Sequence, residues 1–403
     1  MNQTRTRFSF ALMMWLGCVP FAGGAKPLKV FLLVGQSNMQ GHAHVSTFDA
    51  IGLDPSAKAL LESMQDSKGA PAVCDHVWIS SIGNDGSEKE FSGKLTVGYG
   101  AVGRGTKIGP EFLFGISLEE SIEQPILIIK TAWGGKSLHT DFRPPSAGKY
   151  VFTEEQLETL KKRGKDVEEE KRRRSEASGH YYRLMLQHVQ AVLADLGRVC
   201  PEYDPNAGHE LSGVVWFQGW NDMVDRGVYP NREEPGGYQA YSDLMATFIR
   251  DIRRDLKSPE LPFVIGVMGV GGPTDQYGEK RLRNKRVHDN FRAAMAAPAS
   301  LPEFQGNVTA VYTEKAWDKE LAELKTRGSV LNAKARELSK DKSLSRPQRE
   351  EQIEKLRSEL YTPRELELLT GSSNAEYHYM GSAKVMARIG ESFANAMLRL
   401  MRL

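Results

Sequence analysis

The sequence has little cysteine and almost no net charge. Only 3 of its 403 residues are cysteine. No CxxC pair or Cys/His spacing accompanies them, which excludes a disulfide scaffold and a structural zinc site. Its 53 basic and 51 acidic residues give a formal net charge of +2, which argues against a nucleic-acid partner. The 40% of hydrophobic residues suffices for a large core and excludes wholesale disorder.

Long apolar runs are also scarce, and the first one stands at the N-terminus. Within residues 1–25, Arg5 and Arg7 precede an uncharged run, Phe8–Trp15, and small residues end the segment at Ala25. This layout predicts a signal peptide cleaved near Ala25, and hence an exported protein, periplasmic or secreted. The run is short for a membrane span, so no stable span is expected after cleavage. An uncleaved N-terminal anchor is the alternative.

Short, β-branched apolar runs recur along the chain and predict about five strands. They are Leu28–Val34, Pro125–Lys130, Gly213–Phe217, Phe263–Val267 and Asn307–Tyr312. Continuous apolar strands of this kind are typical of a parallel sheet covered on both faces. Helical patterns lie between them, so the expected fold is α/β, a three-layer α/β/α sandwich. Ligands bind such sheets at the carboxyl ends of the strands.

Two very charged segments interrupt this alternation, near residues 151–180 and 314–370. Neither carries an apolar stripe wide enough for a core of its own, so we expect solvated helical insertions within one domain, residues 26–403. A lid over the site, or an arm that docks a partner, is the functional alternative.

Polar residues follow two of the predicted strands. Ser37 comes after the first strand and a glycine, where its hydroxyl would lie at the ligand-binding edge and the next helix would offer N–H donors. Asn221 follows the third strand and could donate to an oxyanion. Simpler interpretations are an N-capping serine and an Asx turn. His378 precedes the C-terminal helix and could act as general base, although a packed aromatic residue is the simpler interpretation.

The order of these blocks is more informative than any one of them. The blocks are GQSNM at 35–39, GPEF at 109–112, AWGGKSL at 132–138, FQGWND at 217–222 and YHYMG at 377–381. Together they closely resemble the sialate O-acetylesterase-like branch of the SGNH hydrolases, a group of carbohydrate esterases. The resemblance implies a flavodoxin-like sandwich that hydrolyses acetyl or other short acyl esters on a carbohydrate or polysaccharide, with no metal and no organic cofactor.

The resemblance also implies roles for individual residues. Ser37 matches the nucleophile and His378 the base. The oxyanion-hole elements match the Ser37 N–H, Gly135 (with Gly134 as the alternative), Gln218 and Asn221. The candidate substrate contacts are Gln36, Asn38, Trp133 and Trp220. The two tryptophans could stack on a sugar ring, and packing in the core is an equal alternative.

The catalytic acid is where the sequence departs from the family pattern. Many SGNH enzymes have Asp three residues before the histidine, where this chain has Ala375. Glu376 is the candidate we name, because some members of this branch carry an acid at that spacing. Asp222 and Asp225 are alternatives, as is a Ser–His dyad oriented by a backbone carbonyl.

Other interpretations remain open at this stage. A carbohydrate-binding protein without activity is one alternative, supported only by the acid that is absent at position 375, and a lipid esterase or thioesterase on the same scaffold is another. His42 and His44 form an HxH pair, for which solvation or a substrate contact is preferred to metal binding. The sequence does not name the sugar, the oligomeric state or the role of the insertions. It also does not show whether Cys74 and Cys200 are bridged.

Overall fold

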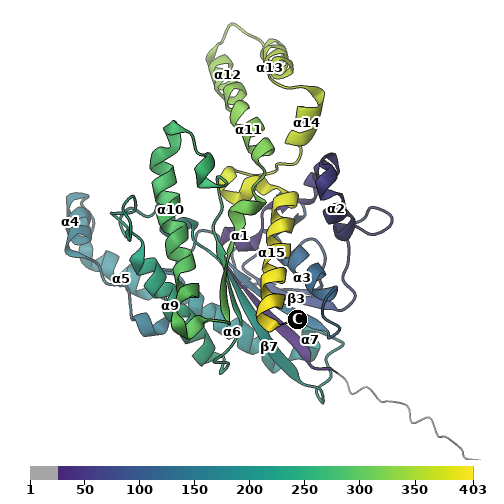
Figure 1. Cartoon of the computed structure of the whole chain (residues 1–403). Helices are drawn as coiled ribbons and strands as arrows, with labels where there is room; N and C mark the ends of the chain where they lie inside the picture. The colour runs from purple at the N-terminus through teal and green to yellow at the C-terminus, as the bar shows by residue number, and fades with distance from the viewer. Residues whose placement is uncertain (1–25, 403) are drawn as a thin grey trace, which may run out of the picture.

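A mostly parallel sheet lies at the centre of residues 26–402, the part of the chain that the computed structural model describes (Figure 1). Its seven strands follow the order β4-β3-β6-β1-β7-β8-β9. They are β1 (Leu28–Gly35), β3 (Val77–Ile82), β4 (Phe91–Lys94), β6 (Ile126–Ala132), β7 (His209–Phe217), β8 (Phe263–Val267) and β9 (Val308–Tyr312). All neighbours are parallel except β4, which pairs antiparallel with β3 at one edge.

The expected α/β/α sandwich is confirmed, but the sheet has seven strands where about five were predicted. All five predicted strands are present, and β3 and β4 join them. In β3 the serines Ser80 and Ser81 interrupt the apolar run, although the whole strand is buried. The edge strand β4 is short and half exposed, so its sequence, FSGK, carries no apolar signal.

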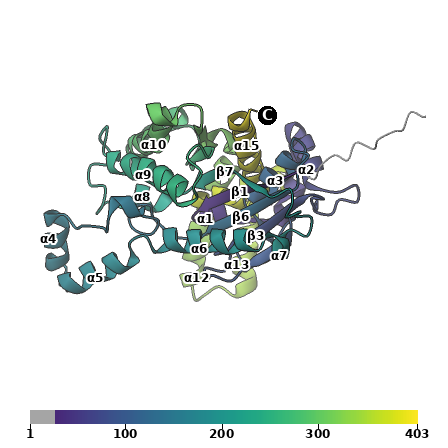
Figure 2. The same ribbon diagram turned by 90° about the horizontal axis from the view of Figure 1, so that it is seen from below.

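Helices cover both faces of the sheet. On one face, α3 (Glu111–Glu119) and α15 (Ala383–Met401) pack against the strands, with Phe393 of α15 on Phe217 of β7. On the other face, α6 (His180–Ala194) and α9 (Gln239–Asp255) do the same, with Phe248 of α9 on Trp216. Figure 2 shows α6 and α15 on opposite sides of the sheet. Neighbouring residues of β7 thus point into two separate apolar layers, as the alternation of a strand requires.

The remaining helices and strands are short or lie at the periphery. They are α1 (Ser37–Gln40), β2 (Ala43–His44), α2 (Lys58–Met64), β5 (Lys107–Ile108), α4 (Glu154–Lys162), α5 (Val167–Ala177), α7 (Leu196–Val199), α8 (Trp220–Val224), α10 (Leu282–Ala296), α11 (Lys319–Arg327), α12 (Ser329–Lys340), α13 (Arg346–Leu360) and α14 (Pro363–Leu369). Both charged segments are helical: α4 and α5 occupy the first, and α11 to α14 the second. In Figure 1 α12 and α13 stand well away from the sheet, above the edge where α1 begins.

Two predictions concern the N-terminal segment and membrane spans, and the pairing of the cysteines was left open. The predicted signal peptide, residues 1–25, lies outside the described residues. Within residues 26–402, no helix combines the length and the apolar character needed to cross a membrane. Cys74 and Cys200 are both buried and both free thiols, so the structure has no bridge between them.

Candidate functional site

The site lies where three adjacent strands end. In the sheet β1 stands between β6 and β7, so the loops that follow these strands meet at one edge. Ser37 follows β1 directly and opens α1. Gly35 has no room for a side chain, because a Cβ there would lie 2.2 Å from the carbonyl oxygen of Phe217. The glycine therefore permits the close approach of β1 and β7 just below the serine.

The loop after β6 runs beside the serine. A methyl group added at Gly134 would lie 3.8 Å from the Cβ of Ser37, which is ordinary van der Waals distance. Gly135, the next residue, is exposed and has a positive φ of 76°, a conformation that glycine adopts without strain. In the WGG loop it is therefore Gly134 that lies beside Ser37, while a Cβ added at Gly135 would meet no atom within 4 Å.

Gln36 holds the serine in its present orientation. Its Oε1 accepts hydrogen bonds from the backbone N–H of Ser37 at 2.9 Å and from the Ser37 hydroxyl at 2.6 Å. Gln36 itself is buried, whereas Ser37 is partly exposed. Both the hydroxyl expected to act as nucleophile and the N–H expected in the oxyanion hole are therefore engaged by the same amide oxygen in this state.

His378 reaches the same edge from the far end of the chain. It lies in a 3₁₀ segment, η10 (Glu376–Gly381), which contacts α1. Tyr379 and Met380 both have positive φ, of 51° and 62°, an uncommon conformation for such side chains. The buried Tyr379 hydroxyl fixes this turn by bonding to the N–H of Gly269 at 2.8 Å and to Thr313 Oγ1 at 2.6 Å.

The imidazole of His378 has two neighbours that fix its position. Its Nδ1 lies 3.1 Å from Asn374 Oδ1. Because an amide oxygen only accepts hydrogen bonds, Nδ1 carries the hydrogen and Nε2 keeps its lone pair. The ring stacks on that of His42, with centroids 3.9 Å apart and planes 2° apart. His42 follows α1, so this stack joins η10 to the serine block.

Both stacked histidines are held in the uncharged form. Burial lowers the pKa of His378 to about 4. Burial has the largest effect on His42, and repulsion by a protonated His378 and by the ammonium groups of Lys107 and Lys130 adds to it, so that the pKa of His42 falls to about 3. The Nε2 atom of His42 is buried without a hydrogen-bond partner among the described residues. At neutral pH His378 therefore offers a free lone pair, which a general base requires.

A buried ion pair between β6 and α3 supports the end of α1. Lys130 Nζ of β6 lies 2.7 Å from Glu111 Oε2, and both side chains are almost fully buried. The same ammonium group donates to the carbonyl oxygens of Gln40 and Tyr99, at 2.8 Å each. Glu111 in turn accepts from the N–H of Gly109 at 2.8 Å. Through Lys130, Glu111 of the GPEF block thus supports the end of α1.

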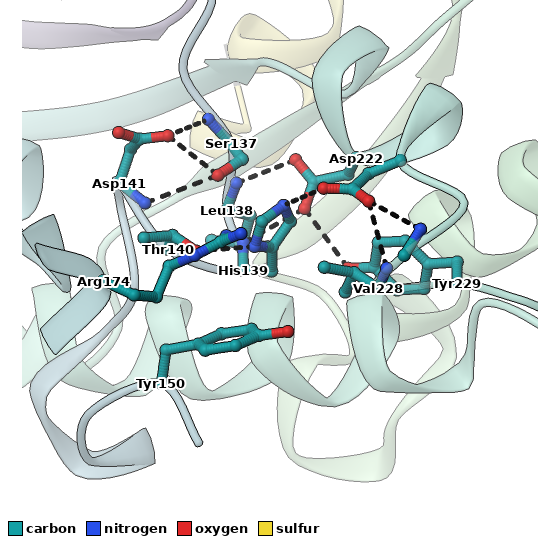
Figure 3. A network of polar contacts seen from close by, with 12 residues as sticks. Ser137, Leu138, His139, Thr140, Asp141, Tyr150, Arg174, Asp222, Val228 and Tyr229 are labelled. Atoms are coloured by element: carbon teal, nitrogen blue, oxygen red, sulfur yellow. Dashed lines mark hydrogen bonds and ion pairs between the residues drawn. The ribbon is translucent and has the colours of Figure 1, made fainter. Parts of the chain in front are cut away.

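A second buried carboxylate organises the loops after β6 and β7. Asp222 accepts hydrogen bonds from the N–H groups of Leu138 at 2.8 Å and His139 at 3.0 Å (Figure 3). It also accepts from Gln218 Nε2 at 2.6 Å and from the Tyr229 hydroxyl at 3.2 Å. Burial raises the pKa of Asp222, and these donors oppose that shift. The residue joins the two loops together.

A family described as "Carbohydrate esterase, sialic acid-specific acetylesterase" matches residues 27–302. The chain belongs to this family of carbohydrate esterases. The resemblance drawn from the GQSN and QGxND blocks is therefore confirmed. His378 lies beyond the matched segment, so its role depends on the geometry described above.

Two solved structures are also similar to parts of this esterase-family chain. One is a protein from Arabidopsis thaliana, at 17% identity and a TM-score of 0.37, over 71% of this chain and 86% of that one. The other is described as a novel carbohydrate acetylesterase from Xanthomonas citri, at 14% identity and a TM-score of 0.35, over 70% of this chain and 49% of that one. Neither overlap is close enough to bear on the site. A comparison with curated protein sequences finds no match.

The structure corrects the expectation for the acid of this esterase-family site. Glu376 is exposed and points to Arg281, with 4.0 Å between the charged atoms, while Asn374 takes the place on His378 Nδ1. Asp222 is committed to the loop network, and Asp225 lies 3.4 Å from His139 Nε2. Local spacing suggested Glu376, but the 3₁₀ turn directs that side chain to solvent.

Two expected oxyanion groups have different surroundings. The Gln218 amide nitrogen donates to the Lys136 carbonyl oxygen at 3.0 Å and to Asp222 at 2.6 Å, so both of its N–H groups are engaged within the protein. Gln218 is therefore a positioning group. Asn221 is half buried and lines a cavity together with Gly135, which keeps it available as a donor.

Of the expected substrate contacts, some are buried in the core and others are accessible. Trp133 is 1% exposed and packs on Tyr181, with its Nε1 donating to the Ser87 carbonyl oxygen, so it belongs to the core. Trp220 is half buried and lies beside the exposed Tyr377. Asn38 is buried, and its Oδ1 has no partner among the described residues.

Sequence reasoning missed Asn374, the Lys130–Glu111 pair and the stack of His42 on His378, although it singled out His42 for solvation or a substrate contact. Asn374 and His42 lie in loops, and no periodic pattern indicates which side chains such loops bring together. The Lys130–Glu111 pair did have a signal, because a lysine inside the apolar run PILIIK needs a buried partner. Among the described residues, no group of three His, Cys, Asp or Glu side chains could hold a metal ion.

Proposed function

We propose that this esterase removes acetyl, or other short acyl, groups from carbohydrate hydroxyls through an acyl-enzyme on Ser37. The observation that carries the proposal is the placement of Ser37. It stands at the carboxyl end of the central strand β1, with the glycine loop at van der Waals distance and the uncharged His378 on the segment that packs against α1. Membership of a carbohydrate esterase family supports the substrate class.

The first half-reaction forms the acyl-enzyme. The Ser37 hydroxyl turns from Gln36 to His378, whose Nε2 takes the proton as Oγ attacks the ester carbonyl carbon. The carbonyl oxygen becomes an oxyanion, for which the Ser37 N–H, the Gly135 N–H and Asn221 are the candidate donors. When the C–O bond to the sugar breaks, His378 returns the proton to the leaving sugar hydroxyl.

The second half-reaction consumes one water. Nε2 of His378 takes a proton from the water as its oxygen attacks the acyl carbon. The bond to Ser37 Oγ breaks, the serine recovers its proton and a carboxylic acid leaves. Asn374 accepts from Nδ1 throughout, and keeps the ring in the tautomer that leaves Nε2 free.

The test compares the wild type with Ser37→Ala and His378→Ala on 4-nitrophenyl acetate and on an acetylated sugar. We expect wild-type turnover of both esters and a loss of at least a hundredfold in kcat in either variant. Wild-type turnover that survives in Ser37→Ala would overturn the mechanism.

A second function is favoured by one observation: His378 Nδ1 lies against the Asn374 amide oxygen, where many SGNH enzymes have a carboxylate. A protein that binds carbohydrate without hydrolysing esters would tolerate this exchange. Covalent labelling of Ser37 by a fluorophosphonate distinguishes the two functions. Labelling supports the esterase, and glycan binding without labelling supports the binding protein. A preference for long acyl chains over acetyl would instead indicate a lipid esterase or thioesterase.

We also propose that the protein is exported and that residues 1–25 are removed on export. The support is the sequence of that segment, with two arginines, an apolar run and small residues at its end. Mass spectrometry of the protein from the cell envelope and medium is the test. A mature N-terminus near Lys26 is expected, and an intact Met1 form in the cytoplasm would contradict export.

A further inference from the structure

A cavity of about 280 Å³ opens beside the expected oxyanion groups, where Gly135 and Asn221 form part of its wall. The other lining residues are Ser137, His139, Thr140, Asp141, Arg173, Arg174, Ala177 and Asp225. The volume lies just below the roughly 300–1,000 Å³ that is usual for small-ligand sites. A single sugar ring therefore suits it better than a chain of sugars.

One wall comes from the first charged insertion. Arg174 of α5 donates through Nη1 to Thr140 Oγ1 at 2.8 Å, and its guanidinium lies over the Tyr150 ring at 4.7 Å (Figure 3). The neighbouring Phe152 ring is 5.7 Å away. A guanidinium fixed by stacking and by one hydrogen bond keeps further N–H donors in a defined plane. The insertion thus contributes a positioned donor group next to the ester site.

The loop after β6 supplies acceptors to the same cavity. Asp141 accepts from the N–H and the hydroxyl of Ser137, at 2.8 Å each, and both bonds go to Oδ2. The other oxygen, Oδ1, keeps its lone pairs. In Figure 3 Asp141 and Arg174 lie on either side of Thr140. The cavity therefore pairs an acceptor with a donor, which matches the hydroxyls of a sugar, since each hydroxyl both donates and accepts.

The charges that line the cavity are balanced. Two arginines stand against two aspartates. Arg173 is also paired with Glu170 on its own helix, and the pKa of Asp225 is lowered to about 2, in part by His139, so its carboxylate stays ionised. The lining therefore has no excess of positive charge to attract a carboxylate on the substrate. An uncharged sugar ring does not need such an attraction.

We propose that this cavity is the subsite for the sugar ring that carries the ester, that Arg174 and Asp141 bind its hydroxyls, and that the ring is uncharged. The first charged insertion is then an element of substrate specificity. This inference rests on the proposed esterase function, which its kinetic test requires. A second test measures sugar binding directly and does not require turnover.

The kinetic experiment compares three esters: 4-nitrophenyl acetate, an acetylated methyl pentoside and an acetylated sialic acid. Arg174→Ala should lower the ratio of kcat/KM for the pentoside to that for 4-nitrophenyl acetate about tenfold. Arg172→Ala is the matched control, because Arg172 lies on the same helix with its side chain 66% exposed and pairs with Glu176. An equal loss of kcat/KM on the pentoside ester and on 4-nitrophenyl acetate would overturn the proposal, because it would show that Arg174 has a purely structural role.

Two further results concern the charge of the sugar. The wild type should prefer the acetylated pentoside to the acetylated sialic acid at least tenfold in kcat/KM. Asp141→Asn, which keeps an oxygen acceptor for Ser137 but removes the negative charge, should narrow that preference. A preference of the wild type for the acidic sugar would overturn the assignment of an uncharged ring.

Direct binding separates this inference from the proposed function. Calorimetry with the free methyl pentoside should show binding to the wild type and to Arg172→Ala, and a tenfold or greater loss in Arg174→Ala. If no ester is hydrolysed but this pattern holds, the esterase mechanism fails and the subsite stands. If esters are hydrolysed and Arg174→Ala binds the sugar as well as the wild type does, the subsite fails alone.

Discussion

The rings of His42 and His378 lie face to face, 3.9 Å apart between centroids and within 2° of parallel. His42 follows the serine helix, and His378 belongs to the turn before the C-terminal helix. The stack therefore ties the proposed base to the block that carries the proposed nucleophile. The stack and the Asn374 amide oxygen together orient the imidazole, a task that a carboxylate usually performs in serine hydrolases.

The stack predicts that His42 is a positioning residue. His42→Ala removes one face of the contact and should lower kcat about tenfold, because misplacement of a general base is costly. His42→Phe keeps a flat ring at the same place and should recover most of kcat. Turnover of 4-nitrophenyl acetate measures both. Equal loss in the two variants would show that the stacked plane does not matter.

The pH dependence follows from the lowered pKa of His378. The base works only when uncharged, so kcat/KM should stay constant down to about pH 5 and fall as the pH drops through about 4. Asn374→Asp places a negatively charged carboxylate beside Nδ1, which favours the imidazolium form and should move this acid limb to higher pH. An unchanged limb in Asn374→Asp would contradict the assigned contact.

The same histidines predict how stability changes with pH. In the unfolded chain both titrate near 6.5, whereas in the folded protein the pKa of His378 is about 4 and that of His42 about 3. Between these values the unfolded chain binds more protons, so the free energy of unfolding should fall as the pH drops from 6.5 to 3. Urea unfolding of wild type and His42→Phe measures it, and the variant should lose less stability over this window.

Glu376 should contribute little to catalysis. Its side chain is 58% exposed and lies 4.0 Å from Arg281, so Glu376→Gln should keep kcat within about twofold, in line with the small energies of exposed ion pairs. The reference is His378→Ala, for which a loss of at least a hundredfold is expected. A loss of similar size in Glu376→Gln would restore Glu376 as the catalytic acid.

The Lys130–Glu111 pair should matter for stability. Lys130→Met leaves the Glu111 carboxylate buried without its counter-charge, at a cost of about 3–5 kcal/mol in the free energy of unfolding. The double variant Lys130→Met/Glu111→Leu should recover much of this loss. The exposed pair Lys58–Glu62 is the control, and Lys58→Met should change the free energy by less than about 1 kcal/mol. Urea unfolding measures all three variants.

The sequence by itself determined the layers of this protein and the order of its chemical blocks. Buried strands such as β1 and β7 can be recognised in the sequence, because a continuous apolar, β-branched run indicates burial on both faces. Parallel strands bring their carboxyl ends to one edge, so Ser37 and Asn221 could be placed there in advance. The edge strand β4 escaped prediction, because a short, half-exposed strand carries no such pattern.

Only the tertiary structure decided which side chains surround the base. The positive φ angles of Tyr379 and Met380 turn Glu376 outward and set His378 between Asn374 and His42. Residue spacing along the chain does not encode such a turn, since it is held by the distant contacts of the Tyr379 hydroxyl. Likewise, Trp133 is a core residue and not a sugar platform, because helix α6 packs over it. Local pattern fixes periodicity and burial, whereas contacts between loops depend on how the whole chain folds.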